Sequence, residues 1–253
     1  MKVAALYDIH GNLPALEAVL AEIEREKVDQ VVVGGDVLPG PMPRETLQTL
    51  LDLKIPTRFI MGNGDRVVLE QLRGQTPTKL PESARDAIRH SAQEIMPQQV
   101  EEIAAWPQTL ELDIAGLGRV LFCHATPRND TEIFVKTTSE EKLSSVFSQT
   151  RADVVVCGHT HMQFDRMVGS KRIVNAGSIG MSYGEPGAYW LMLGPGVELR
   201  RTNYDLQRAA ERLRKTNYPE IEKFIANDLL HPKSEQEMVE LFAKREVKVS
   251  TAN

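Results

Sequence analysis

The chain has 253 residues, with 30 Lys and Arg against 35 Asp and Glu, and a formal net charge of −5. Its 42% hydrophobic and 26% charged residues exclude a disordered or fibrous chain. The longest uncharged apolar runs have the length of strands, so we expect neither a membrane span nor a secretory leader. Two cysteines exclude a disulfide framework, and we expect a cytoplasmic protein.

Strands and helices alternate along the first 61 residues. Short apolar runs at 3–7, 31–33 and 58–61 predict buried strands. Apolar residues at helical spacing predict one helix over 13–26, with Asn12 as its N-cap, and another over 43–53. This order indicates parallel strands joined by right-handed crossovers.

The remaining chain adds helices and further strands. Residues 66–108 are polar and helix-like, and we expect them to form a helical insertion over the strand ends. Strands are expected at 109–114, 119–123, 153–157, 163–168, 171–175, 188–193 and 197–202, and helices at 139–150 and 205–245. The expected fold class is α/β (α+β), a four-layer αββα sandwich of two mixed β-sheets flanked by helices. We expect one domain over 1–204, with 205–253 as a helical extension packed on it.

Residues that can bind metal ions follow five of the expected strands. They are two carboxylates, one amide and four of the six histidines: Asp8, His10, Asp36, Asn63, His124, His159 and His161. Because ligands of α/β sheets bind at the carboxyl ends of strands, we expect these side chains to meet at one edge. Oxygen and imidazole ligands of this kind suit Mn, Fe, Zn, Ni or Co.

The number of ligands indicates two ions. Seven donors are too many for one ion that leaves a position open for substrate, but they suit two ions that share a carboxylate. Two divalent cations held by Asp8 and Asp36 leave a net positive centre, which favours a phosphate group and the charge that develops on it during reaction. Paired ions can also generate hydroxide near neutral pH. The sequence therefore favours phosphoester hydrolysis without a protein nucleophile.

Five motifs occur in the order in which a known family carries them: Asp8-x-His10-Gly11-Asn12, Gly35-Asp36, Gly62-Asn63, His124 and Gly158-His159-x-His161. They resemble the calcineurin-like metallophosphoesterase superfamily, and most closely its small prokaryotic, phosphodiesterase-like branch. The resemblance implies one metal ion bound by Asp8, His10, Asp36 and His161. It implies a second ion bound by Asp36, Asn63, His124 and His159. A hydroxide bridging the two ions would then attack phosphorus.

One position departs from this resemblance. Many relatives carry a histidine after the Gly-Asn pair that assists the leaving group, and here that position is Gly64. Asp65 is a candidate catalytic acid and could equally orient a liganding histidine. The resemblance implies that Asn12 and Asn63 touch phosphate oxygens, and Arg66 could pair with another.

The prediction is a metal-dependent phosphohydrolase that cleaves a small phosphoester or phosphoanhydride. Phosphatase, phosphodiesterase and dinucleoside polyphosphate hydrolase activities stay open, and Gly64 favours substrates with good leaving groups. The alternatives are a non-catalytic scaffold of the same fold that binds a protein partner, and a nuclease, although the acidic balance opposes specific nucleic-acid binding. The expected partners are a small phosphorylated substrate, phosphate and, as a further option, a second copy of the chain. No membrane partner is expected.

Three further features are expected to be structural. Cys123 and Cys157 end strands and are expected in the core rather than in a redox site. The Asn-x-Gly-Ser segment at 175–178 is expected to be a turn near the site rather than a substrate contact. His90 is expected on a solvated helix face, although a lid over the site could bring it near the substrate.

Overall fold

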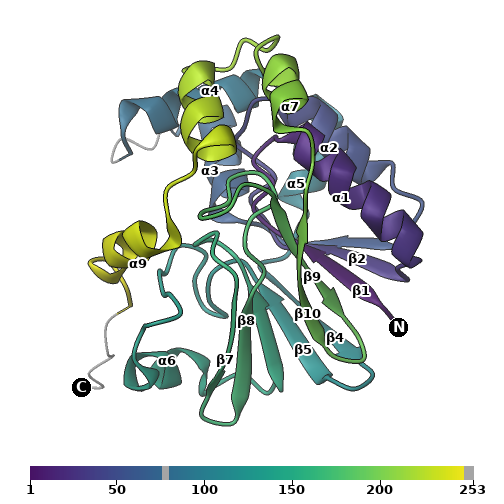
Figure 1. Cartoon of the computed structure of the whole chain (residues 1–253), viewed down its shortest axis with the longest axis vertical. Coiled ribbons are helices and arrows are strands. Elements are labelled where there is room, and N and C mark those ends of the chain that lie inside the picture. Colours follow the sequence, from purple (N-terminus) through teal and green to yellow (C-terminus); the bar gives the residue numbers. More distant parts are fainter. Residues whose placement is uncertain (76–79, 248–253) are drawn as a thin grey trace.

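The strands of the computed structural model, which describes residues 1–75 and 80–247, form two five-stranded sheets (Figure 1). In spatial order the first sheet contains β10 (Val197–Thr202), β9 (Ala188–Leu193), β1 (Val3–Leu6), β2 (Gln30–Val33) and β3 (Thr57–Phe59). The second contains β4 (Thr109–Ile114), β5 (Gly118–Cys123), β6 (Val154–Cys157), β8 (Lys171–Asn175) and β7 (Phe164–Val168). Each sheet has three parallel strands (β1, β2 and β3; β5, β6 and β8), and antiparallel strands complete it.

The helices of the described part lie mostly on the outer face of the first sheet. They are α1 (Leu13–Glu26), α2 (Pro43–Leu51), α3 (Asn63–Leu72), α4 (Glu82–Glu94), α5 (Pro97–Ala104), α6 (Glu140–Phe147), α7 (Leu206–Leu213), α8 (Ile221–Phe224) and α9 (Glu235–Ala243). A π-helical segment, η1 (Ile225–Leu230), continues α8. None of them is long and apolar enough to cross a membrane.

The alternation of side chains along β1 builds the layers. Val3 and Ala5 pack toward the second sheet, in a cluster that includes Phe122 of β5. Ala4 and Leu6 point to the opposite face and pack with α1 and α2. On the outer face of the second sheet, α6 covers a third cluster. The expected four-layer αββα order is therefore confirmed.

The expected insertion over 66–108 contains α3, α4 and α5, but the first of these helices begins earlier than predicted, at Asn63. Gly62 is its N-cap residue, and the Asp65 carboxylate accepts a hydrogen bond from the Gly62 amide at 3.0 Å. A carboxylate in the first turn stabilises the free amides of a helix N-terminus. Asn63 therefore lies on a helix rather than in a loop. Residues 76–79 of the insertion and 248–253 of the C-terminal extension lie outside the described residues.

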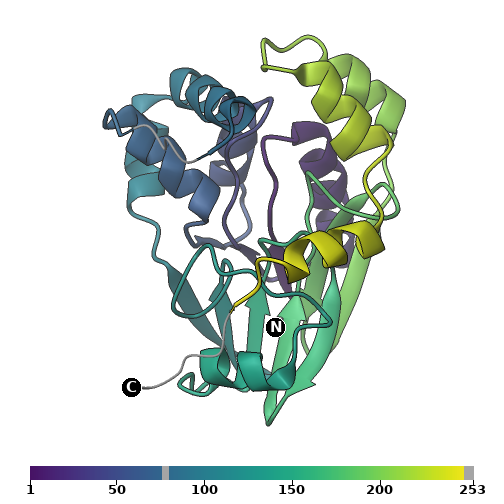
Figure 2. The same cartoon turned by 90° about the vertical axis from the view of Figure 1, so that its left-hand side faces the viewer.

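The C-terminal segment packs on the rest of the chain through two apolar clusters. One joins α7, α8 and η1, and the partly buried Met42, Met181 and Tyr204 pack against it. The other joins Met238 of α9 to Val135 and Met162. In Figure 2 the helices α3 and α4 stand on one side of the strand ends, and α8 and η1 stand on the other.

Candidate metal centre

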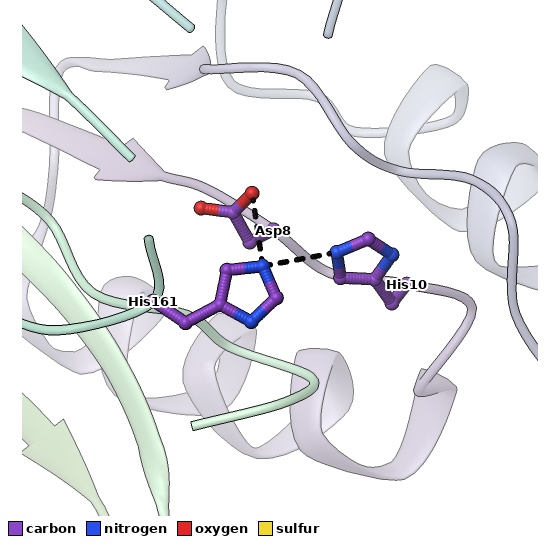
Figure 3. Close-up of side chains that lie close together, drawn as sticks. All are labelled: Asp8, His10 and His161. Carbon is purple, nitrogen blue, oxygen red and sulfur yellow. Dashed lines mark hydrogen bonds and ion pairs between the residues drawn. The ribbon is translucent and has the colours of Figure 1, made fainter. Parts of the chain in front are cut away.

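The first group of candidate ligands consists of Asp8, His10 and His161, and Figure 3 shows how they point toward one another. Asp8 and His10 follow β1, and His161 follows β6. Nε2 of His161 lies 3.4 Å from Oδ1 of Asp8 and 3.2 Å from Nε2 of His10. The ligand atoms of the group all lie within 4.8 Å of one another.

The second group consists of Asp36, His124 and His159, which follow β2, β5 and β6. Nε2 of His124 lies 3.4 Å from Oδ2 of Asp36. The side-chain amide of Asn63 adjoins this group, with one atom 3.0 Å from His124 Nε2 and 2.9 Å from His159 Nδ1. The three side chains of the group and the Asn63 side-chain amide could therefore bind the same metal ion.

Asp36 lies between the two groups. Its Oδ2 is 3.7 Å from Nε2 of His10, in the first group, and 3.4 Å from Nε2 of His124, in the second. Nε2 of His124 is also 3.9 Å from Oδ1 of Asp8. The structure thus brings the seven predicted ligands together from five strand ends, with Asp36 in the position of a shared ligand.

Backbone carbonyls set the orientation of three of the imidazoles. The hydrogen bonds from Nδ1 are His10 to Pro39 O at 3.2 Å, His124 to Gly34 O at 3.0 Å and His161 to Met181 O at 2.7 Å. Because a carbonyl only accepts, Nδ1 carries the proton, and in the neutral ring Nε2 presents its lone pair to the centre.

A cation fits this arrangement. The lone pairs on Nε2 of His10 and His161 would repel each other across 3.2 Å without a positive charge between them. Oδ1 of Asp8 is fully buried and accepts no hydrogen bond within the described part of the chain. A buried carboxylate oxygen without a partner is costly, and a bound metal ion would satisfy it.

The loops that carry the candidate ligands, called the ligand loops below, have an unusual backbone conformation. Five of the candidate ligands adopt the left-handed conformation, with φ of 53° at Asp8, 47° at His10, 52° at Asp36, 67° at His159 and 58° at His161. Each such residue costs about 1–3 kcal/mol and persists only where its surroundings hold it in place. A cluster of strained residues at one point of a fold indicates a functional site.

Neighbouring charged side chains of the candidate metal centre shift one another's pKa values. Burial lowers the pKa of His159, and repulsion from His124 adds to this effect, so that the pKa is about 4. Burial also opposes charge on His124, but the adjacent Asp36 outweighs it and raises the pKa to about 10. A metal ion that binds His124 would compete with a proton there, so we expect metal affinity to depend on pH.

Position 64 has no room for a side chain. A Cβ at Gly64 would collide with the backbone carbonyl oxygen of Leu38. The amide of Gly64 instead donates to Oδ1 of Asp36 at 2.6 Å. The glycine that departs from the expected motif is thus required by the close approach of the loop after β2.

The Asp65 carboxylate stabilises the loop after β2, which carries Asp36, rather than facing a substrate. Its Oδ2 accepts from the amide of Asp36 at 2.8 Å, and its Oδ1 accepts from the amide of Leu38 at 3.0 Å. Burial and the neighbouring Asp36 raise the pKa of Asp65 to about 7. Although this pKa would suit an acid, the side chain is fully buried and its oxygens are occupied. Within the described residues its hydrogen bonds come from backbone amides and not from a candidate imidazole ligand, so its contacts support neither predicted role.

The two predicted phosphate contacts besides Asn63 lie elsewhere. Arg66 donates to both carboxylate oxygens of Asp130, at 2.7 and 3.2 Å, and to Glu70 at 2.8 Å. Asn12 is fully buried: its Oδ1 caps α1 at Ala15 and its Nδ2 donates to Gly180 O at 3.0 Å. In the structure both side chains make structural contacts, so their contact with substrate stays a prediction, whereas Asn63 lies beside the second ligand group.

The features expected to be structural are confirmed, apart from His90. Cys123 and Cys157 are buried. In the turn at 175–178, Asn175 donates to Gly158 O at 2.7 Å and Ser178 Oγ donates to Asp8 O at 2.7 Å, so the turn supports the ligand loops. The ring of His90 packs edge-on against Tyr218 at 5.3 Å instead of lying in solvent.

A model of the calcineurin-like phosphoesterase superfamily domain matches residues 1–193. The chain belongs to this superfamily. An uncharacterized protein of Methanocaldococcus jannaschii is 26% identical to it over 238 residues, which cover 86% of this chain and 94% of that protein. The superfamily comprises metal-dependent phosphoesterases, and the two ligand groups are residues that could hold divalent metal ions.

Two solved structures share the calcineurin-like phosphoesterase fold. A hypothetical protein from Pyrococcus horikoshii OT3 superposes with a TM-score of 0.79 at 20% identity, covering 92% of this chain and 99% of that one. A metallophosphoesterase from Sphaerobacter thermophilus superposes with a TM-score of 0.70 at 23% identity, covering 90% of this chain and 99% of that one. At these identities the likeness extends to the fold.

Sequence reasoning missed the residues that surround the centre. The C-terminal segment places Tyr218, Lys223 and Asp228 in a cavity that also contains His10 and Asp36. Tyr183 stacks on the ring of His161 at 5.8 Å. Nothing in the local pattern of these residues marks them, because they approach the site only through tertiary packing.

Proposed function

We propose that the protein is a phosphohydrolase that uses two divalent transition-metal ions, of Mn, Fe, Zn, Ni or Co, to cleave a small phosphoester or phosphoanhydride. The observation that carries the proposal is the position of Asp36 Oδ2, within 3.7 Å of His10 Nε2 and 3.4 Å of His124 Nε2. A carboxylate between two imidazole groups suits two ions better than one. Membership of the phosphoesterase superfamily supports the same reaction class.

Asp8 and Asp36 each use one carboxylate oxygen to accept a hydrogen bond from a backbone amide. Oδ2 of Asp8 accepts from the amide of His159 at 2.8 Å, and Oδ1 of Asp36 accepts from the amide of Gly64 at 2.6 Å. The other oxygen of each is left for an ion. Asp8, His10, Asp36 and His161 would hold one ion, and Asp36, Asn63, His124 and His159 would hold the other.

When bound, paired divalent ions lower the pKa of water and offset the charge on a phosphate group. The carbonyl contacts of His10, His124 and His161 keep the imidazoles oriented toward the centre. Since position 64 has no side chain and Asp65 is buried, we propose that substrates with good leaving groups, which need less protonation, react best.

The test combines metal analysis with hydrolysis. We expect the purified protein to bind about two equivalents of a transition metal and to hydrolyse a chromogenic aryl phosphodiester with Mn. Chelation should inactivate it, and Mn, Co or Ni should restore activity to different degrees. Metal binding without hydrolysis of any phosphoester would favour the scaffold alternative, and absence of metal binding would overturn the proposal.

The cytoplasmic location, the small phosphorylated partner and a second copy of the chain as partner are further proposals. A gradient-sedimentation or light-scattering measurement tests the last of these. A panel of monoesters, diesters and anhydrides run on metal-replete protein separates the activities that the reaction class leaves open.

A further inference from the structure

A cavity of about 440 Å³ lies over the candidate metal centre, and His10, Asp36 and Asn63 contribute to its lining. This volume is in the range of sites that bind small organic molecules. Its walls come from two separate parts of the chain. One is formed by α3 and α4, and the other by α8 and η1 with the residues just before them.

The first wall is apolar and contains small side chains. Val67 of α3, Leu80, and Ala84, Ala87 and Ile88 of α4 line it. The two alanines leave space that larger residues would fill. All three line the cavity, but Ala84 is only partly buried, whereas Ala87 and Ile88 are buried, so position 84 is the more accessible place for a larger side chain.

The second wall lies beyond the residues that the superfamily domain matches, which end at 193. Tyr218 and Phe224 give it an aromatic surface, and Phe224 is held in the apolar cluster of α7, α8 and η1. His90 of α4 meets the ring of Tyr218 edge-on, with ring centres 5.3 Å apart. This contact joins the two walls.

The charges of the walls do not favour a substrate with several phosphate groups. Among the lining residues that the structure describes, Lys223 is the one with a positive side chain, and its Nζ lies 2.6 Å from Oε1 of Glu220. Asp228 adds a negative charge to the same wall. Arg66, a candidate for binding phosphate, pairs with Asp130 instead. The candidate metal centre is therefore the main feature of the cavity that attracts an anion, and the walls add little positive charge to bind further phosphate groups.

On the basis of the proposed function, we propose that the substrate is an ester of a single phosphate group with an uncharged, largely apolar or aromatic organic group that packs between α4 and α8–η1. The phosphate would lie at the ligands from the strand ends. Ala84 and Tyr218 would select the organic group. Polyphosphates and dinucleoside polyphosphates would be poor substrates, because their additional charges would meet apolar side chains.

The first test compares substrates on the Mn-loaded full chain. We expect kcat/KM for phenyl phosphate or an aryl phosphodiester to exceed that for tripolyphosphate by about tenfold or more, the discrimination that a hydrophobic pocket provides. Calorimetry should show phenylphosphonate binding more tightly than inorganic phosphate. A preference for tripolyphosphate, or equal binding of the two anions, would overturn the proposal.

The second test fills the space beside α4. Ala84→Phe should lower kcat/KM for the aryl esters about tenfold more than that for methyl phosphate, and it should remove the preference for phenylphosphonate. Gln93→Phe is the matched control, because Gln93 is exposed on the same helix and does not line the cavity. Equal losses for aryl and methyl substrates in Ala84→Phe would place the organic group elsewhere.

The outcomes distinguish this proposal from the one on which it rests. If the metal-loaded protein hydrolyses no phosphoester or phosphoanhydride, the proposed function is wrong. If it hydrolyses polyphosphates and simple alkyl esters as well as aryl esters, the function holds and the substrate class is wrong. The comparison of substrates on the unaltered chain gives this answer even if Ala84→Phe does not fold.

Discussion

The ligand loops at the strand ends and the wall formed by α8 and η1 line the same cavity, but different interactions stabilise them. In the loops, five candidate ligands hold a left-handed backbone, and amides, carbonyls and the Asp65 carboxylate fix the chain around them. The wall consists of a four-residue helix and a six-residue π-helical segment. An apolar cluster shared with α7 holds it to the rest of the chain, and an exposed ion pair joins Glu222 of α8 to Arg214.

This difference suggests that the ligand loops carry out the reaction and that the wall selects the substrate. Strained ligand residues need many simultaneous contacts, so a change at one of them affects the whole centre. The wall depends on apolar packing, which tolerates substitutions of similar volume. Substitutions in the two regions should therefore differ in the size and kind of their effect.

The largest effect is expected at the shared ligand. Asp36→Asn keeps the shape of the side chain and an acceptor for the Gly64 amide but removes the charge, which should lower kcat/KM about a thousandfold if the ions contribute several kcal/mol. His124→Ala should act similarly, and both variants should lose metal by elemental analysis. His231→Ala, outside both ligand groups, is the control. Near-normal rates in either ligand variant would contradict the ligand assignment.

The next effect concerns the stability of the wall. Leu213 is fully buried in the cluster of α7, α8 and η1, and Leu213→Ala should lower the free energy of unfolding by about 2–5 kcal/mol. Urea unfolding measures the loss, and metal content should stay unchanged. Leu199→Ala, at a side chain that is 46% exposed, should cost less than about 0.5 kcal/mol. Loss of metal from Leu213→Ala would show that the two regions are coupled.

A smaller effect is expected at Arg66. Its two hydrogen bonds to Asp130 hold the loop after β5 against α3, and the side-chain amide nitrogen of Asn63 can donate to the backbone oxygen of Asp130 at 3.0 Å. Arg66→Ala should therefore reduce activity about 10–100-fold through the position of Asn63. Adding Asp130→Ala should cause little further loss, because the residues act as one unit.

The matched control for that pair is Arg172→Ala, which breaks a similar two-bonded ion pair with Asp165 on the second sheet. It should leave kcat/KM within about twofold, as is usual for surface pairs. If Arg66→Ala instead raises KM for every phosphate substrate and leaves kcat unchanged, Arg66 binds phosphate directly, as the sequence first suggested.

The smallest effect is expected where α7 meets α1. Arg212 donates two hydrogen bonds to Glu17, at 2.5 and 3.0 Å, but both side chains are at least 40% exposed. Arg212→Ala should therefore change the free energy of unfolding by less than about 1 kcal/mol, and the difference should vanish in about 1 M salt. A loss above about 2 kcal/mol would mean that this pair, rather than apolar packing, holds α7 against α1.

The layers and the ligand set were predictable because both depend on local patterns. The alternation along β1 determines which side chains face each layer, and helical spacing identifies α1 with Asn12 as its cap. Asp8, Asp36 and His124 could be placed at one edge because parallel strands carry their carboxyl ends to the same side. Sequence alone thus determined the fold class, the order of the layers and which side chains gather at the candidate metal centre.

The tertiary structure decided what surrounds that centre. The partners of Arg66 and Asn12, Asp130 and Gly180, lie 64 and 168 residues away along the chain, and the wall at Tyr218 reaches the ligands from beyond the matched domain. Side-chain partners and cavity walls depend on which distant segments pack together. Sequence periodicity is sufficient to show which side chains of a strand face each layer. It does not show which distant segments pack together.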